Sequence, residues 1–157
     1  PSLAGERLCS DELQVVCAPD HALARCRSVA AGALVEHAYL SREQGSGTRE
    51  VTDHYLKRAG IEPGALNVVM EASSVEAGMG FAIMSHVSVL KEVRLGLLVR
   101  IPLSPPITRQ LTAVYPRERI QSGLVGAFVQ FAKRRLDVPP GEGAGEKELA
   151  ISARSAP

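Results

Sequence analysis

Short apolar runs alternate along the chain with glycine-rich or proline-rich breaks, a pattern typical of an α/β domain. A short apolar run bounded by turn residues predicts a strand, and apolar positions at three- to four-residue spacing predict a helix. The strands predicted in this way are residues 13–17, 38–40, 66–70, 81–84, 97–101 and 110–115. Helices are predicted at residues 47–59, 86–93 and 122–136, with short helical turns at 22–24 and 29–35.

The helix over residues 47–59 has the clearest pattern. Val51, Tyr55 and Ala59 recur at four-residue spacing on one stripe, with Leu56 beside it, which predicts the apolar face of the helix. Gly60 follows directly and predicts a left-handed helix stop. Because one strand precedes this helix and another follows it, the segment predicts a βαβ unit with parallel strands and a right-handed crossover.

The last strand and helix carry apolar residues at regular spacing. Residues 110–115 alternate apolar and polar, with Leu111, Ala113 and Tyr115 on one face, as in a half-exposed strand. The helix over 122–136 is expected to bury Leu124, Phe128, Phe131 and Leu136. Its basic end, Lys133-Arg134-Arg135, suits either a phosphate patch or a helix C-terminus.

One helix start signal has almost no helix after it. Ser73 and Glu76 have the spacing of a capping box, yet Gly78 follows two residues later, where a helix would end. A packed helix usually runs about ten residues or more. We therefore expect that about two turns of helix are absent between Ala77 and Gly78.

Composition narrows the classes of protein. With a formal net charge of +1, the chain as a whole has no strong electrostatic attraction to nucleic acid. No apolar run approaches the roughly 20 residues that cross a bilayer, so no membrane partner is expected. The cysteines Cys9, Cys17 and Cys26 are odd in number and lack Cys-x-x-Cys spacing, which favours a reducing cytoplasm. The proline- and glycine-rich residues 138–157 predict a disordered tail.

The candidate binding site is the glycine-rich loop between the strand at 38–40 and the long helix. Gly45, Ser46, Gly47 and Thr48 offer free N–H groups, two hydroxyls and the positive end of a helix, all of which favour an anion. The loop lacks the lysine of a nucleotide-hydrolysing P-loop. The glycines serve equally well as a turn and helix cap, so both interpretations stay open.

Other polar residues give weaker signals. Ser73 and Ser74 follow another strand end and are candidates for the same crevice, although they also suit helix capping. Arg42 and Glu43 at the mouth of the loop are expected to be solvated, as is His54, while Cys17 is expected in the core. No cluster of histidines, cysteines and carboxylates has metal-ligand spacing, and no nucleophile motif occurs. The sequence predicts no catalytic residue, metal or cofactor.

Several motifs together resemble the LysR-type transcriptional regulators. Residues 11–24, Asp-Glu-Leu-Gln-Val-Val-Cys-Ala-Pro-Asp-His-Ala-Leu-Ala, resemble the hinge strand and turn of that family. Residues 41–49, Ser-Arg-Glu-Gln-Gly-Ser-Gly-Thr-Arg, resemble a loop of its effector-binding domain. Residues 71–76, 78–85 and 95–99 keep the family's order, and the resemblance extends over about residues 8–137.

The resemblance implies an α/β fold like a type II periplasmic binding protein, with a mostly parallel sheet and two lobes around an effector cleft. It assigns residues 1–18 to a hinge strand region, 19–109 to the second lobe, and 110–137 to the returning strand and helix of a first lobe that is only partly present. The implied ligand-binding residues are Ser41, Gly45, Ser46, Gly47, Thr48, Ser73 and Ser74, and the implied hinge residues are Pro19 and Asp20.

The implied function is the effector-sensing portion of a LysR-type regulator, which binds a small and often anionic molecule to control transcription. In the family, DNA is bound by a separate helix-turn-helix domain, absent from this chain, and the working form is a homodimer or tetramer. Because only part of the cleft is present, we expect effector affinity near the millimolar range. The alternatives are a solute-binding protein for transport, an enzyme that holds a phosphate ester at Ser46 and Thr48, and a truncated remnant that senses nothing.

Overall fold

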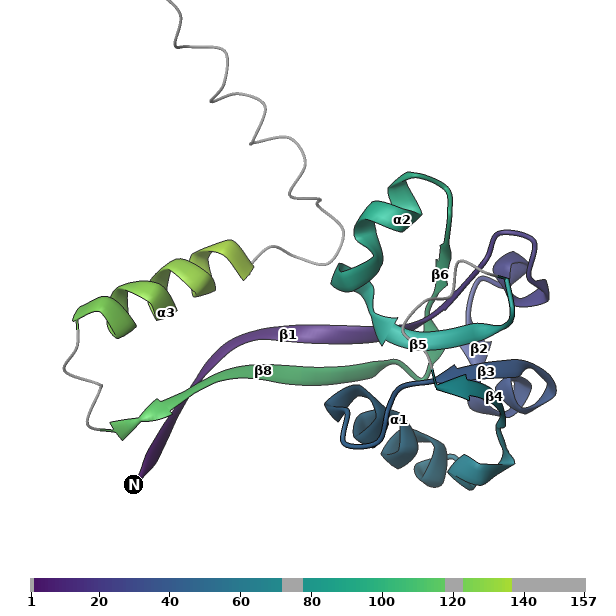
Figure 1. Ribbon diagram of the computed structural model, residues 1–157, viewed down its shortest axis with the longest axis horizontal. Helices are drawn as coiled ribbons and strands as arrows, with labels where there is room; N and C mark the ends of the chain where they lie inside the picture. Colours follow the sequence, from purple (N-terminus) through teal and green to yellow (C-terminus); the bar gives the residue numbers. More distant parts are fainter. Residues whose placement is uncertain (1, 72–77, 118–122, 137–157) are drawn as a thin grey trace, which may run out of the picture. The chain divides into compact units, whose positions relative to one another are not determined.

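The computed structural model describes residues 2–71, 78–117 and 123–136, and the chain divides into two compact units (Figure 1). Unit 2 is the continuous stretch Asp11–Arg109. Unit 1 combines the residues up to Ser10 with those from Gln110 onward. The chain therefore passes between the units twice, once along each of two long strands.

The strands form a mixed sheet. They are β1 (Leu3–Cys17), β3 (Ala38–Ser41), β4 (Asn67–Glu71), β5 (Phe81–Ser85), β6 (Val99–Ile101) and β8 (Ile107–Pro116). The order is β4-β3-β5-β1-β6, and β8 pairs with β1. β3 runs parallel to β4 and β5, whereas β1 runs antiparallel to β5 and β6. A separate parallel pair joins β2 (Val29–Ala30) to β7 (Leu103–Ser104). The parallel pairing of the strands that flank the long helix is confirmed.

Alternate residues of the central strands of unit 2 face two separate cores. One face buries Val15, Cys17, Phe81 and Ile83, and the helix α1 (Gly47–Arg58) covers it through Leu56. The opposite face buries Leu40, Val16 and Ala82 against Val89 and Leu98, next to the helix α2 (Leu90–Arg94). Because a strand turns successive side chains to opposite faces, the two helices lie on opposite sides of the sheet (Figure 1).

The boundaries of α1 agree with the sequence prediction, and its apolar stripe agrees in part. Gly60 has φ of +75°, the left-handed stop that was expected. The buried positions of the helix are Thr48, Thr52 and Leu56. Thr52 can be buried because its hydroxyl donates to the backbone oxygen of Thr48 at 2.9 Å. The predicted stripe is confirmed in part: Val51 and Tyr55 are half-buried and pack against the core beside Leu56, whereas Ala59 is exposed.

Other elements differ from their predicted bounds. β1 begins at Leu3, well before the predicted start at residue 13, because its first half alternates half-buried and exposed residues rather than forming an apolar run. β6 begins at Val99, since Gly96 and Leu97 belong to the preceding turn. The helical turns near residues 22 and 31 are short 3-10 helices, η1 (Ala22–Arg25) and η2 (Ala31–Glu36). Two more, η3 (Pro63–Ala65) and η4 (His86–Val89), precede β4 and α2.

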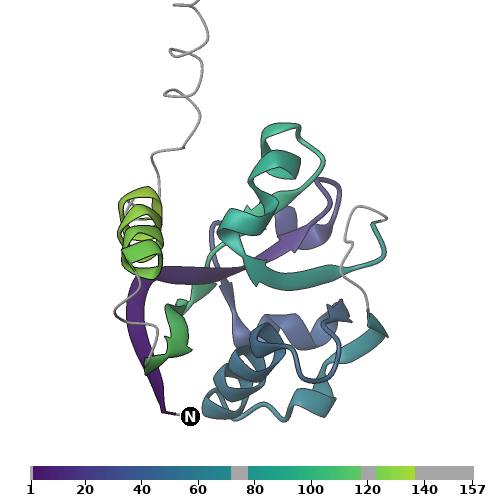
Figure 2. The same ribbon diagram turned by 60° about the vertical axis from the view of Figure 1, so that its left-hand side comes forward.

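Unit 1 consists of the first part of β1, most of β8 and the helix α3 (Gly123–Leu136). Figure 2 shows α3 beside β1. Glu6 in β1 accepts hydrogen bonds from Lys133 of α3 and from Tyr115 of β8, and this pairing lowers the pKa of Glu6. The alternation of β8 is confirmed, with residues 111, 113 and 115 half-buried.

The burial predicted for α3 was wrong. Val129 is its buried side chain, whereas Leu124 is 81% exposed and Phe128 is 63% exposed. Phe131 and Leu136 are exposed as well. The described part of unit 1 offers one packing partner, the β1–β8 strands, so only one side of the helix is covered. Among the described helices, none is long and apolar enough to cross a membrane.

Three of the sequence expectations lie outside the described residues. These are the positions of Ser73 and Ser74, the missing helical turns between Ala77 and Gly78, and the disordered tail over 138–157.

The cysteines are expected to differ sharply in reactivity. Cys17 is fully buried in the core, as its apolar run predicted, and burial raises its pKa to about 11. Cys26 is exposed. Because the thiolate is the nucleophile, iodoacetamide at pH 8 should label Cys26 within minutes and Cys17 only after unfolding. Peptide mass spectrometry with and without denaturant measures this, and rapid native labelling of Cys17 would contradict the burial.

Candidate functional site

The glycine-rich loop joins the end of β3 to the start of α1, as the sequence predicted. Gly45 has φ of +84°, a conformation that glycine adopts without strain, and Gly45 and Gly47 are both exposed. Ser46 is the N-cap of α1, yet its side chain makes no capping hydrogen bond. The first N–H groups of a helix have no partner within the helix, so those of Gly47 and Thr48 are left for solvent or a ligand.

The hydroxyl side chains of this region are more enclosed than the resemblance implied. Ser41 is only 2% exposed, and its hydroxyl donates to the backbone oxygen of Arg42 at 3.2 Å. Ser46 and Thr48 are each 9% exposed. A ligand at this loop would therefore meet backbone N–H groups first, and the serine hydroxyls only where they reach the surface.

Arg109 reaches the same end of α1 from β8, although it was not among the site residues predicted from the sequence. Its Nη1 donates to Thr48 Oγ1 at 3.1 Å, and its Nε donates to Asp11 Oδ2 at 2.8 Å. Asp11, 2% exposed, also accepts from Ser85 Oγ at 2.6 Å, and His86 Nδ1 lies 3.8 Å from the same carboxylate. We refer to Asp11, Thr48, Ser85 and Arg109 as the Asp11 cluster.

One signal in the sequence could have pointed to Arg109. Leu111 and Ala113 lie on the inner face of β8 because side chains alternate along a strand. The same alternation, extended back by two residues, places Arg109 on that face as well. An arginine on the inner face of a strand needs a buried acceptor. The partner, Asp11, lies 98 residues away in the chain, so spacing alone does not identify it.

Arg42 and Glu43 pair with each other at the mouth of the loop. Arg42 Nε and Nη2 donate to the two carboxylate oxygens of Glu43 at 2.7 and 2.8 Å. This pairing lowers the pKa of Glu43 to about 2. The expectation of solvated charges holds for Glu43, which is exposed, whereas Arg42 is half-buried. Since each neutralises the other, the pair adds little net charge to the loop.

The start of α1 is therefore an electropositive end with donors at hand. A helix N-terminus carries roughly half a positive charge. The positive charge of Arg109 is balanced by the buried carboxylate of Asp11, and Glu50 lies in the first turn of α1, so the helix end itself supplies the positive potential for an anion. Such an arrangement suits a carboxylate or phosphate group placed against the N–H groups of Gly47 and its neighbours.

Pro19 and Asp20, the implied hinge residues, lie in an exposed turn just after β1. Both belong to unit 2, and the chain leaves that unit at Ser10–Asp11 and at Arg109–Gln110. The boundary between the two units lies before Pro19, because β1 is continuous to Cys17 and its second half already pairs with the strands of unit 2. In the described part of the chain, no group of three histidines, cysteines or carboxylates could hold a metal ion.

Comparison with known proteins identifies the family. The profile of the LysR substrate binding domain matches residues 1–137, which is most of the chain. The chain belongs to the LysR substrate-binding-domain family. A probable RuBisCO transcriptional regulator of Cyanidioschyzon merolae is 30% identical over 138 residues, 83% of this chain and 46% of the relative. The regulator CbbR of Cereibacter sphaeroides is 34% identical over 125 residues, 76% of this chain and 40% of the relative.

Solved structures support the fold of this LysR substrate-binding domain. The CcmR regulatory domain of Synechocystis PCC6803 in complex with 2-PG matches with a TM-score of 0.73 and 22% identity over 86% of this chain and 67% of that one. The effector-binding domain of QuiR in complex with shikimate matches with a TM-score of 0.71 and 20% identity, over 87% and 66%. The α/β fold of the periplasmic-binding-protein type is thus confirmed. The chain spans less than half the length of the curated relatives it matches.

Proposed function

We propose that this LysR substrate-binding domain is the effector-sensing part of a transcriptional regulator, and that it binds a small anion at the start of α1. In this proposal the rest of a longer regulator supplies the DNA-binding domain, and the working form is a cytoplasmic homodimer or tetramer. The family assignment and the curated relatives, which are transcriptional regulators, support the regulatory role. They favour it over transport or catalysis.

The observation that carries the ligand proposal is the uncapped start of α1 beside Arg109. Ser46 occupies the N-cap without using its side chain to satisfy the helix, so the N–H groups of Gly47 and Thr48 are open to an anion. Arg109 holds Thr48 through a hydrogen bond, which fixes the last residue of the loop. Gly45 and Gly47 leave the backbone exposed to an approaching ligand.

Ser41, Ser46 and Thr48 enter the proposal as residues that shape the loop and offer hydroxyls at its surface. Ser73 and Ser74 stay as proposed ligand residues, and Pro19 and Asp20 as proposed hinge residues. The ligands bound in the two similar solved structures, 2-PG and shikimate, suggest the probes for a first test. With donors from α1 and its surroundings alone, we expect about −4 kcal/mol of binding free energy, which is a millimolar Kd.

Two substitutions at Gly47 isolate the contribution of the backbone N–H. A Cβ added at Gly47 would have no atom within 4 Å, so alanine fits there. Gly47 is also the first residue of α1, a position at which proline is well tolerated. Ser46 already has the extended backbone that a following proline requires, with φ of −70° and ψ of 125°. Gly47→Ala keeps the donor, whereas Gly47→Pro removes it. We expect Gly47→Pro to bind the probe about tenfold more weakly than Gly47→Ala, a difference of about 1.4 kcal/mol.

Amide shifts in ¹⁵N-labelled full chain, titrated with 2-PG, shikimate or inorganic phosphate, measure this difference. Saturable shifts should centre on residues 45–49. Arg109→Gln should also weaken binding, while the exposed Arg27→Gln should not, and thermal unfolding of each variant checks that it is folded. Equal affinities for the two Gly47 variants, or shifts centred elsewhere, would overturn the proposed ligand site.

A further inference from the structure

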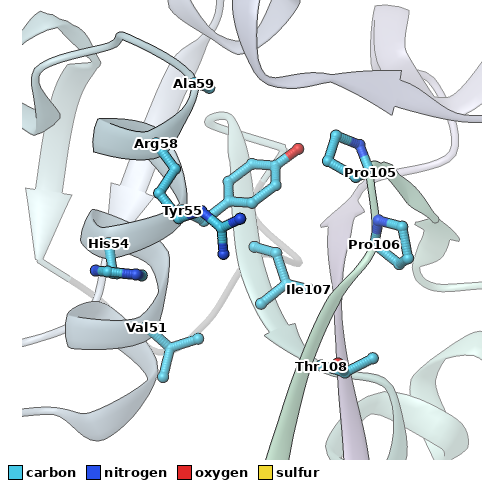
Figure 3. A pocket seen from close by; sticks show the side chains of 9 residues that line it. All are labelled: Val51, His54, Tyr55, Arg58, Ala59, Pro105, Pro106, Ile107 and Thr108. Atoms are coloured by element: carbon cyan, nitrogen blue, oxygen red, sulfur yellow. The ribbon is translucent and has the colours of Figure 1, made fainter.

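A pocket lies along the side of α1, away from its N-terminal end. It has a volume of about 460 Å³ and is bounded by Val51, Tyr55 and Arg58 of the helix and by Pro105, Pro106 and Ile107 of the segment before and at the start of β8 (Figure 3). All these residues belong to unit 2. Pockets that hold small molecules typically measure about 300–1,000 Å³, so the volume suits a small organic ligand.

The apolar wall of the pocket is the stripe of α1 that the sequence predicted as its apolar face. The helix meets the sheet through Thr48, Thr52 and Leu56, so the neighbouring stripe is left beside the pocket. Val51 and Tyr55 are only half-buried there. Ile107, which is 4% exposed, forms part of the opposite wall. An apolar ligand body placed between the helix and Ile107 would remove the exposed surface of Val51 and Tyr55 from water.

The hydroxyl of Tyr55 has no hydrogen-bond partner among the described residues, although it is shielded from water. Figure 3 shows the tyrosine ring extending from α1 toward Pro105, with the oxygen at the far end. Prolines have no N–H, so Pro105 and Pro106 cannot donate to this oxygen. Burial raises the pKa of Tyr55, which keeps the phenol protonated as a donor. A buried phenol without a partner is rare in folded proteins, and a shift of the ring that opens the oxygen to the pocket would let an acceptor from a ligand satisfy it.

Arg58 supplies a charge at the same pocket. It is exposed and forms no ion pair with another described residue. Figure 3 shows its side chain reaching from the helix on the side that carries Tyr55. A guanidinium binds a carboxylate with two parallel hydrogen bonds, and a carboxylate also accepts from a phenol.

We propose that this pocket is a second binding site, specific for a small organic carboxylate with an apolar body. The carboxylate pairs with Arg58 and accepts a hydrogen bond from Tyr55, and the apolar body lies between Val51 and Ile107. The site is separate from the anion site proposed at the start of α1, because its lining residues do not include the Gly45–Thr48 loop.

Phenylacetate is a suitable probe, since it combines a carboxylate with an apolar ring. Titrated into the ¹⁵N-labelled full chain, it should cause saturable amide shifts at Val51, Tyr55, Ala59, Ile107 and Thr108. Arg58→Gln and Tyr55→Phe should each weaken binding about tenfold, because each removes a hydrogen bond to a charged group. The neutral analogue 2-phenylethanol should bind at least about tenfold more weakly.

Lys57→Gln is the matched control, because it removes a neighbouring positive charge of α1 that does not line the pocket. It should leave the affinity for phenylacetate within about twofold, and thermal unfolding should show that all three variants are folded. Unsaturable shifts, equal binding of the neutral analogue, or self-association of the chain through this face would overturn the proposal. Saturable shifts confined to residues 45–49 would also overturn it, while supporting the anion site at the start of α1.

Discussion

Replacing Gly80 with alanine is expected to lower the free energy of unfolding by about 3 kcal/mol, the upper part of the usual range for overpacking. An added Cβ would overlap the carbonyl oxygen of Ala38 and lie 3.0 Å from its carbonyl carbon. Both atoms belong to backbone, which cannot rotate away as a side chain does. Gly80 directly precedes Phe81, which pairs with Tyr39 across the parallel strands and stacks on its ring at 5.1 Å.

Urea unfolding followed by circular dichroism measures this loss. Gly32→Ala is the matched control, since a Cβ there meets nothing within 4 Å. That variant should be as stable as the parent or slightly more stable, because alanine reduces the freedom of the unfolded chain. A Gly80→Ala variant that unfolds at the same urea concentration as Gly32→Ala would show that β3 and β5 do not approach each other as described.

Replacing Asp11 with alanine is expected to cost about 3–4 kcal/mol of stability. The substitution removes the carboxylate that accepts from Arg109 and Ser85, and it leaves the arginine without its ion-pair partner in a half-buried position. The loss comes mainly from the charge that stays behind. The exposed Asp20→Ala is the control and should change stability by less than about 0.5 kcal/mol.

A double variant separates the ion pair from simple packing. Asp11→Leu combined with Arg109→Met removes both charges together, so no charged group stays buried without a partner. We expect the double variant to lose clearly less stability than Asp11→Ala in the same urea experiment. A double variant that is less stable than Asp11→Ala would mean that the ion pair itself, with its hydrogen bonds to Ser85 and Thr48, contributes more than hydrophobic replacements can.

Much of unit 2 could be predicted because its elements carry local signals. Gly60 marks the end of α1 by a conformation that other residues rarely adopt, and the run Phe81–Met84 is apolar enough to predict β5. The first half of β1 gave no such signal, since Gly5, Glu6 and Arg7 follow one another where half-exposed strand positions alternate.

The sequence predicted the loop of the candidate site but not the residues, distant in the chain, that contact this loop. The Gly45–Thr48 loop follows from residue types and from its place between a strand and a helix. The contact of Arg109 with Thr48 spans 61 residues, and it depends on how β8 runs past the start of α1. Hydrophobicity also failed to indicate that Thr48 and Thr52 are buried, because it assigns threonine to the surface whether or not its hydroxyl is satisfied within the helix.

The side chain at position 52 must therefore meet two requirements: it must fill a buried volume, and it must donate a hydrogen bond to the backbone. Serine would keep the hydrogen bond to the backbone oxygen of Thr48 but leave a methyl-sized void, and valine would fill that volume but give up the bond. Alanine would leave the volume unfilled and would also lose the hydrogen bond. Threonine meets both requirements in this fully buried place, so the range of acceptable replacements there is narrower than its apparent polarity suggests.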